Sequence, residues 1–204
     1  MSIQQTYQRR RKAVFLDKDG TLLENVPYNV EPSRMRLAER AGPALRLLQE
    51  AGYALFVVSN QSGIARGIFP ESAIASMREH LEQLLKAEGV ALAGFYYCPH
   101  HPDGTVRAYA LPCTCRKPAP GLLHLAAREY GVDLQSSWLI GDILDDVEAG
   151  NRAACRTVLL DNGGETEWLM TPSRRPHCFA PNLYDAAWML LANEQPLVQV
   201  GGTG

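Results

Sequence analysis

The sequence contains no long hydrophobic run. No apolar segment approaches the roughly 20 residues that a membrane-spanning helix needs, and none near the N-terminus resembles a secretory signal. We therefore expect a cytoplasmic protein that does not bind membranes. Neither sign of charge dominates: the formal net charge is −2, which does not indicate extended nucleic-acid binding, and the basic residues 9–12 are interpreted as a solvated lead-in to the first strand.

Cysteines are few and their number is odd. Five thiols without a secretory signal argue against a disulfide framework. Stability must then come from a hydrophobic core, and 204 residues with 46% hydrophobic content can bury roughly 70% of the surface of the unfolded chain. We expect one monomeric domain over residues 1–192 and a disordered tail at 193–204.

Apolar strand-like runs alternate with amphipathic helical patterns along the chain. Expected strands cover residues 13–16, 54–58, 94–97, 138–140 and 157–160, and expected helices cover 42–50, 71–88, 120–130, 183–191 and a segment that ends at 153. This alternation predicts an α/β fold with a doubly wound, mainly parallel sheet. The segment 22–35 is too short for a large cap domain, and we interpret it as a flap over the site.

Two carboxylates come directly after the first apolar strand. Asp17 and Asp19 are two residues apart, so both can face one bound group if the extended geometry continues. One carboxylate can attack phosphorus, while its neighbour protonates the leaving oxygen and later deprotonates water. The alternative is an ordinary turn that uses Asp and Gly for their dihedral freedom.

Two further strands also end in polar residues. Ser59 and Asn60 close one of them, and a hydroxyl with adjacent backbone N–H groups can hold phosphoryl oxygens. Asp142 and Asp146 follow the other and offer oxygen ligands to a divalent cation, for which magnesium is the natural choice. Lys117 lies between these junctions, where it could neutralise charge on a transferred phosphoryl group; the alternative is a solvated surface lysine.

A second group of candidate ligands lies in a segment rich in Pro and Gly, at residues 98–115. Its members are three thiols and one imidazole, namely Cys98, His100, Cys113 and Cys115. Four such ligands suit a closed, tetrahedral zinc site that folds a loop without taking part in the chemistry. A disulfide and free buried thiols are the alternatives. The adjacent His101 could replace His100, although Cys-x-His and Cys-x-Cys mirror each other only with His100.

Taken together, the polar strand ends resemble the four motifs of the haloacid dehalogenase (HAD) superfamily of phosphohydrolases. The resemblance implies that Asp17 is the nucleophile and Asp19 the general acid and base. It also implies that Ser59 and Lys117 bind the phosphoryl group. The implied magnesium ligands are Asp17, the backbone carbonyl of Asp19, and Asp142. Asp146 is implied to support the metal site without being a direct ligand.

Three segments indicate which family within the HAD superfamily the chain resembles. Residues 59–67, 96–102 and 115–118 are similar to those of the heptose bisphosphate phosphatases, which share the zinc loop with the histidinol-phosphate phosphatases. This implies removal of the 7-phosphate of D-glycero-D-manno-heptose 1,7-bisphosphate, a step towards lipopolysaccharide, with His100 as the zinc ligand. A substrate with two phosphates needs a second anion site, for which Arg66 and Arg116 are candidates because guanidinium groups bind phosphate through a planar fork.

Two features depart from this pattern. Ile143 stands where the heptose enzymes often carry a lysine, and the segment 160–168 differs from the short Thr-Gly loop expected there. The sequence therefore defines the type of reaction more closely than it defines the substrate. Histidinol phosphate or another small sugar phosphate is an alternative, and a zinc-stabilised binding protein without catalysis is an alternative of another class.

Overall fold

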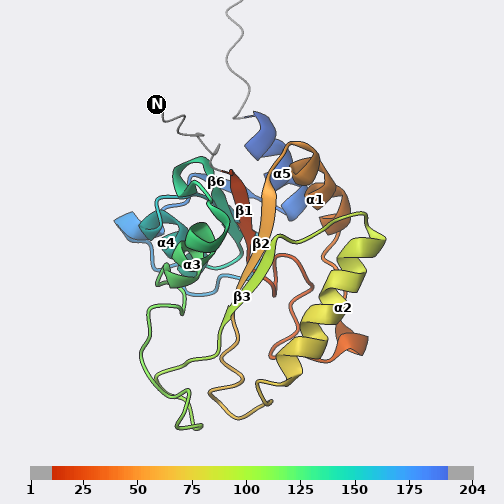
Figure 1. Ribbon diagram of the computed structural model, residues 1–204. Coiled ribbons are helices and arrows are strands. Elements are labelled where there is room, and N and C mark those ends of the chain that lie inside the picture. Colours follow the sequence, from red (N-terminus) through yellow and green to blue (C-terminus); the bar gives the residue numbers. More distant parts are fainter. Residues whose placement is uncertain (1–10, 193–204) are drawn as a thin grey trace, which may run out of the picture.

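A computed structural model describes residues 11–192 and contains one six-stranded sheet. The strands are β1 (Ala13–Leu16), β2 (Ala54–Asn60), β3 (Gly94–Cys98), β4 (Trp138–Gly141), β5 (Arg156–Leu160) and β6 (Cys178–Ala180). Their order is β3-β2-β1-β4-β5-β6, and every neighbouring pair is parallel. Connections that leave β1 in both directions make the sheet doubly wound, as the alternation of strands and helices predicts (Figure 1).

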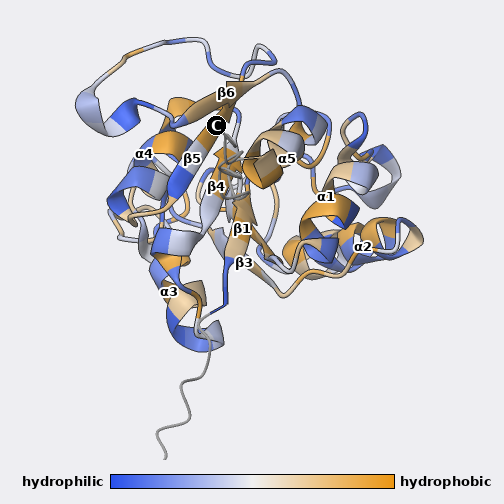
Figure 2. Ribbon diagram, turned by 90° about the horizontal axis from the view of Figure 1, so that it is seen from above, coloured by the Kyte–Doolittle hydropathy of each residue, from blue (hydrophilic) through white to orange (hydrophobic). Residues whose placement is uncertain are grey.

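Helices cover both faces of this sheet. They are α1 (Ala41–Glu50), α2 (Ala73–Ala87), α3 (Gly121–Tyr130), α4 (Leu144–Arg152) and α5 (Leu183–Ala192). Figure 2 shows α3 and α4 on one side and α1, α2 and α5 on the other. Successive residues of β1 alternate between the two layers: Val14 packs into the core beneath α1 and α5, whereas Phe15 packs into the core beneath α3.

The expected elements are present, with ends that differ by at most two residues. The apolar stripe of α2 consists of the buried residues Ile74, Met77, Leu81 and Leu85. The strand β6 was not predicted, because Cys178–Ala180 is only three residues long and Phe179 is half exposed. The predicted tail at 193–204 lies outside the described residues.

A short flap follows β1, and no cap domain is present within residues 11–192. Isolated bridges join Leu23 to Asp19 and to Leu37, which keeps both ends of the flap near the residues that follow β1. A 3₁₀ turn, η1 (Pro32–Arg34), lies at the far end of the flap. Leu22, Leu23 and Met35 anchor it in the core beneath α1. The flap therefore stays close to the residues that follow β1.

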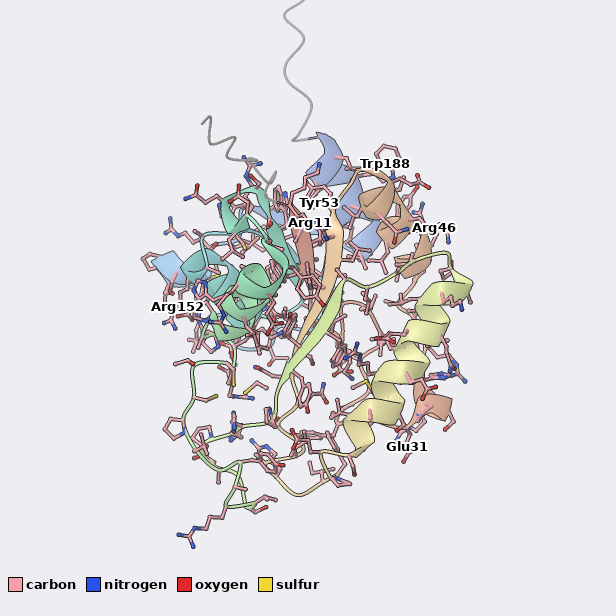
Figure 3. The ribbon with its side chains drawn as sticks, viewed as in Figure 1. Arg11, Glu31, Arg46, Tyr53, Arg152 and Trp188 are labelled. Carbon is pink, nitrogen blue, oxygen red and sulfur yellow. The ribbon has the colours of Figure 1, made fainter. Side chains whose placement is uncertain are left out.

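All strands run in one direction, so their carboxyl ends form a single edge of the sheet. The loop 99–119, drawn in green, and the connection from β2 to α2 both lie at this edge (Figure 1). Figure 3 places Arg11 and Tyr53 at the opposite end, where they line a cavity of about 860 Å³ that is remote from the acidic motifs. None of the helices within residues 11–192 is long and apolar enough to cross a membrane.

Candidate active site and metal centres

Three carboxylates converge at the carboxyl edge of the sheet. Asp17 continues β1 in extended geometry, since its backbone N–H donates to the Ile140 carbonyl of β4 at 3.0 Å. Asp142 follows β4 directly, and Asp146 lies in the first turn of α4. One oxygen from each of the three carboxylates lies within 4.8 Å of the others. The simple-turn alternative for Asp17 fails, because its side chain belongs to this cluster.

Lys117 supplies a positive charge to the cluster. Its ammonium contacts Asp17 Oδ1, lies 2.5 Å from Asp146 Oδ1 and donates to the Val58 carbonyl at 2.9 Å. The side chain is 1% exposed, so the alternative of a solvated surface lysine is wrong. Burial acts to lower the pKa of Lys117, but the charges of Asp146 and Asp17 outweigh it and raise that pKa. The side chain is therefore a permanent ammonium.

The donor set fits a hard divalent cation. Burial, reinforced by the charges of Asp17 and Asp146, raises the pKa of Asp142 to about 7. Burial also raises the pKa of Asp146. The Asp146 Oδ1 atom has no partner in hydrogen-bond geometry among the described residues. One ammonium cannot balance three carboxylates, and oxygen-only ligands are those that magnesium prefers. Asp17, Asp142 and Asp146 are thus the side chains that could hold such an ion.

Ser59 and Asn60 end β2 beside the cluster. Ser59 is 1% exposed, and its hydroxyl oxygen accepts a hydrogen bond from the Gln61 amide at 2.8 Å. The Asn60 side chain donates to the Lys117 carbonyl at 3.1 Å and accepts from the Lys117 N–H at 3.0 Å. Both ends of this side-chain amide are therefore engaged with the backbone of Lys117. The sequence did not reveal that Asn60 holds Lys117 in place.

Asp19 stands apart from the three carboxylates. Its Oδ1 lies 2.7 Å from the ammonium of Lys18, which is fully buried and also donates to the Asn29 carbonyl of the flap at 3.4 Å. Burial raises the pKa of the Asp19 carboxyl, while the charge of Lys18 opposes this effect. Lys18 therefore connects the flap to the predicted acid, a contact that no sequence pattern indicates.

The loop after β5 also reaches the cluster. The backbones of Gly20 and Gly164 flank Asp142 so closely that a Cβ on either would lie 2.1 Å from Asp142 Oδ2. Asn162 fixes this arrangement by donating to the Gly20 carbonyl at 2.7 Å. The unexpected segment 160–168 thus forms one wall of the site. At Ile143, the backbone N–H donates to Asp146 at 3.3 Å, so this residue contributes through its main chain.

The second group of ligands also assembles. The side chains of Cys98, His100, Cys113 and Cys115 offer ligand atoms within 4.8 Å of one another. The three sulfurs are 3.1, 3.3 and 3.5 Å apart, far beyond the roughly 2.05 Å of a disulfide bond, and all five cysteines of the chain are unpaired. The disulfide alternative is therefore wrong. A tetrahedral ion with bonds of roughly 2.3 Å to sulfur would require sulfur separations of about 3.8 Å, close to those observed.

His100 rather than His101 joins this group. His100 Nδ1 lies 3.3 Å from the Cys115 sulfur. His101 points elsewhere: its Nε2 lies 3.0 Å from the Arg66 guanidinium, and its Nδ1 accepts the Asp103 N–H at 3.1 Å. Burial, followed by the charges of Arg116 and Arg66, lowers the pKa of His101. Arg66 and Arg116 therefore approach the same imidazole, and the buried Arg116 Nη1 has no hydrogen-bond partner within the described part of the chain.

A doubly wound parallel sheet that gathers carboxylates and one lysine around an aspartate after its central strand is the arrangement of the haloacid dehalogenase-like hydrolases. Residues 114–186 match a family model described as HAD-hydrolase-like. A D-glycero-beta-D-manno-heptose-1,7-bisphosphate 7-phosphatase from Photorhabdus laumondii is 44% identical over 153 residues, which cover 75% of this chain and 81% of that protein. The chain therefore belongs to the HAD phosphatases, in the family of these heptose bisphosphate phosphatases.

Solved structures agree with this placement. A HAD-like phosphatase from Mesorhizobium loti has 34% identity and a TM-score of 0.78, covering 90% of this chain and 85% of that one. The D,D-heptose 1,7-bisphosphate phosphatase from B. bronchiseptica, solved with magnesium and phosphate, has 28% identity and a TM-score of 0.73 over 89% of this chain and 99% of that one. Both share the HAD fold with this chain.

Proposed function

We propose that this phosphatase removes the 7-phosphate of D-glycero-D-manno-heptose 1,7-bisphosphate. The observation that carries the reaction is the convergence of Asp142, Asp146 and Lys117 on Asp17 at one edge of the sheet. The substrate is supported by the names of the relatives that match most of the chain. A soluble phosphorylated sugar is consistent with a site that no cap domain covers within residues 11–192.

In the first step, a carboxylate oxygen of Asp17 attacks phosphorus and forms an aspartyl-phosphate, while the bond from phosphorus to the sugar oxygen breaks. Asp19 donates its proton to that leaving oxygen. In the second step, Asp19 takes a proton from water, which attacks phosphorus and releases phosphate and the Asp17 carboxylate. Burial of Asp19 favours the protonated form that the first step requires, and Lys18 holds the carboxyl in place.

The remaining residues stabilise charge on the phosphoryl group. The Lys117 ammonium lies against Asp17 and is always charged, so it can neutralise negative charge that develops on the oxygens. Ser59 and the backbone of Asn60 offer further hydrogen bonds. Asp17, Asp142 and the backbone carbonyl of Asp19 are the proposed magnesium ligands, with Asp146 in support; when bound, magnesium would supply further charge neutralisation at the phosphoryl oxygens.

Zinc is proposed for the cluster of Cys98, His100, Cys113 and Cys115. All four ligands come from the protein, which leaves no open position for a substrate, so the role is structural. The 1-phosphate of the substrate is assigned to Arg66 and Arg116. The unpartnered Arg116 Nη1 supports this assignment, because a buried donor without an acceptor is costly unless a ligand satisfies it.

A substrate panel with wild type and Asp17→Asn tests the proposal. The wild type should have the highest kcat/KM on the heptose bisphosphate, above histidinol phosphate and simple monophosphates. Asp17→Asn should lose at least about a thousandfold in kcat, since it removes the nucleophile, while it retains its fold and zinc content. Preference for histidinol phosphate would refute the substrate assignment. An inert wild type across the panel would refute the reaction and favour a binding protein.

A further inference from the structure

Two tyrosines from different parts of the chain donate to one carboxylate, that of Glu71. Glu71 lies two residues before α2. Tyr97, on β3, donates to Glu71 Oε1 at 2.9 Å, and Tyr109, in the loop 99–119, donates to Glu71 Oε2 at 2.6 Å. Hydrogen bonds to a carboxylate group are stronger than those between neutral groups. Nothing in the proposed chemistry uses this carboxylate.

The bond from Tyr109 holds the tip of the loop, residues 101–112, which lies outside the group of zinc ligands. Within this tip, the Tyr109 carbonyl accepts the His101 N–H at 3.2 Å. The tip also rests on the connection from β2 to α2, since the N–H groups of Thr105 and Val106 donate to the Ala65 carbonyl at 2.8 and 2.9 Å. A Cβ at Gly104 would lie 2.7 Å from that same oxygen, so the fit is close.

The loop is therefore attached at two places. The cysteines and His100 hold its base, from which Arg116 and Lys117 project. Glu71 holds its tip, which carries His101. The contact of His101 with Arg66, at 3.0 Å, spans the tip and the β2–α2 connection and depends on their alignment. The two segments lie side by side at the lower end of the molecule in Figure 1.

We propose that Glu71 is a positioning residue for substrate selectivity: through Tyr109 it sets the tip of the loop so that Arg66 and His101 meet where the second phosphate binds. This inference rests on the proposed bisphosphate substrate. The two attachments of the loop then have different roles. The metal-ligand base places Lys117 at the transferred phosphate and Arg116 at the second one. Glu71 aligns Arg66 with His101, and this contact lies on the side that distinguishes a bisphosphate from a monophosphate.

Tyr109→Phe and Tyr97→Phe form a matched pair, because each removes one hydroxyl from the same carboxylate and only Tyr109 lies on the loop. For Tyr109→Phe, the ratio of kcat/KM on the heptose bisphosphate to kcat/KM on heptose 7-phosphate should fall roughly tenfold, mainly through KM. Tyr97→Phe should leave this ratio unchanged. Added to Arg66→Ala, Tyr109→Phe should cause little further loss, because both act on the same contact.

Equal loss on both substrates, or equal effects of the two Phe variants, would overturn the inference and leave Glu71 with a general structural role. Hydrogen exchange of the amides in residues 101–112 provides a readout without substrate: it should accelerate in Tyr109→Phe and not in Tyr97→Phe. Unchanged exchange in Tyr109→Phe would also overturn the inference. If instead the wild type shows no preference for the bisphosphate while exchange responds as expected, the substrate assignment fails and the attachment of the loop by Glu71 stands.

Discussion

The side chain of Asn60 is hydrogen-bonded to both the N–H and the C=O of Lys117, although 57 residues separate them in the chain. This pair fixes the main chain at the point from which the Lys117 ammonium reaches Asp17. A residue that sequence patterns assign to phosphate binding therefore acts on the site through the backbone of another residue.

Replacement of Asn60 should affect turnover more than substrate binding. Asn60→Ala removes two hydrogen bonds, so we expect kcat to fall roughly tenfold with little change in KM, as measured by steady-state kinetics. Asn182→Ala is the matched control, since the Asn182 side chain pairs with Asp185 at the start of α5; it should cost roughly 1 kcal/mol of stability and leave kcat unchanged. A rise in KM at unchanged kcat would instead indicate direct contact of the Asn60 side chain with phosphate.

Loss of the Lys117 charge should destabilise the magnesium-free protein. Lys117→Met leaves the buried Asp146 and the partly buried Asp17 without their cation, and removal of one partner from a buried ion pair costs about 3–5 kcal/mol. Urea unfolding at pH 8 measures this loss. The double variant with Asp146→Asn should recover part of it, because the remaining repulsion is smaller. Additive losses would show that Asp146 and Lys117 do not interact.

Magnesium should matter more to stability as the pH rises. Burial raises the folded-state pKa of Asp142 to about 7 from its ordinary value of 3.8, so below pH 4 its contribution to stability is fully present. That contribution is lost as the pH rises towards 7, where the buried carboxyl must ionise. We expect the Tm of protein dialysed free of magnesium to fall over this range relative to Asp142→Asn, and added magnesium to reverse the fall. Parallel pH profiles for the two proteins would contradict the assignment.

Cys113→Ser should lower the stability of the loop 99–119 rather than affect the catalytic step directly. Loss of one of four ligands should lower the zinc content, measured by atomic emission, and lower the Tm. Cys178→Ser removes a thiol outside the cluster and should change neither quantity. Full zinc content in Cys113→Ser would show that the ion binds elsewhere.

Local patterns were sufficient to predict the central strands and the acidic strand ends, because each lies within one short apolar run and the polar residues that follow it. They did not predict β6, whose three residues carry no periodic signal, or the approach of Gly164 to Asp142. The bonds of Glu71 to Tyr97 and Tyr109 span 26 and 38 residues. Contacts of this kind depend on how loops meet after the sheet has formed, which no local pattern encodes.

The parallel arrangement of β1 and β4 has a consequence for how the enzyme acquires activity. Asp17 and Asp142 come from opposite halves of the sequence and meet only when these two strands pair. A chain in which these strands have not paired thus has its two aspartates far apart. If the proposed magnesium ion binds there, its affinity would arise only with this pairing, and the ion would favour the folded state over states that lack it.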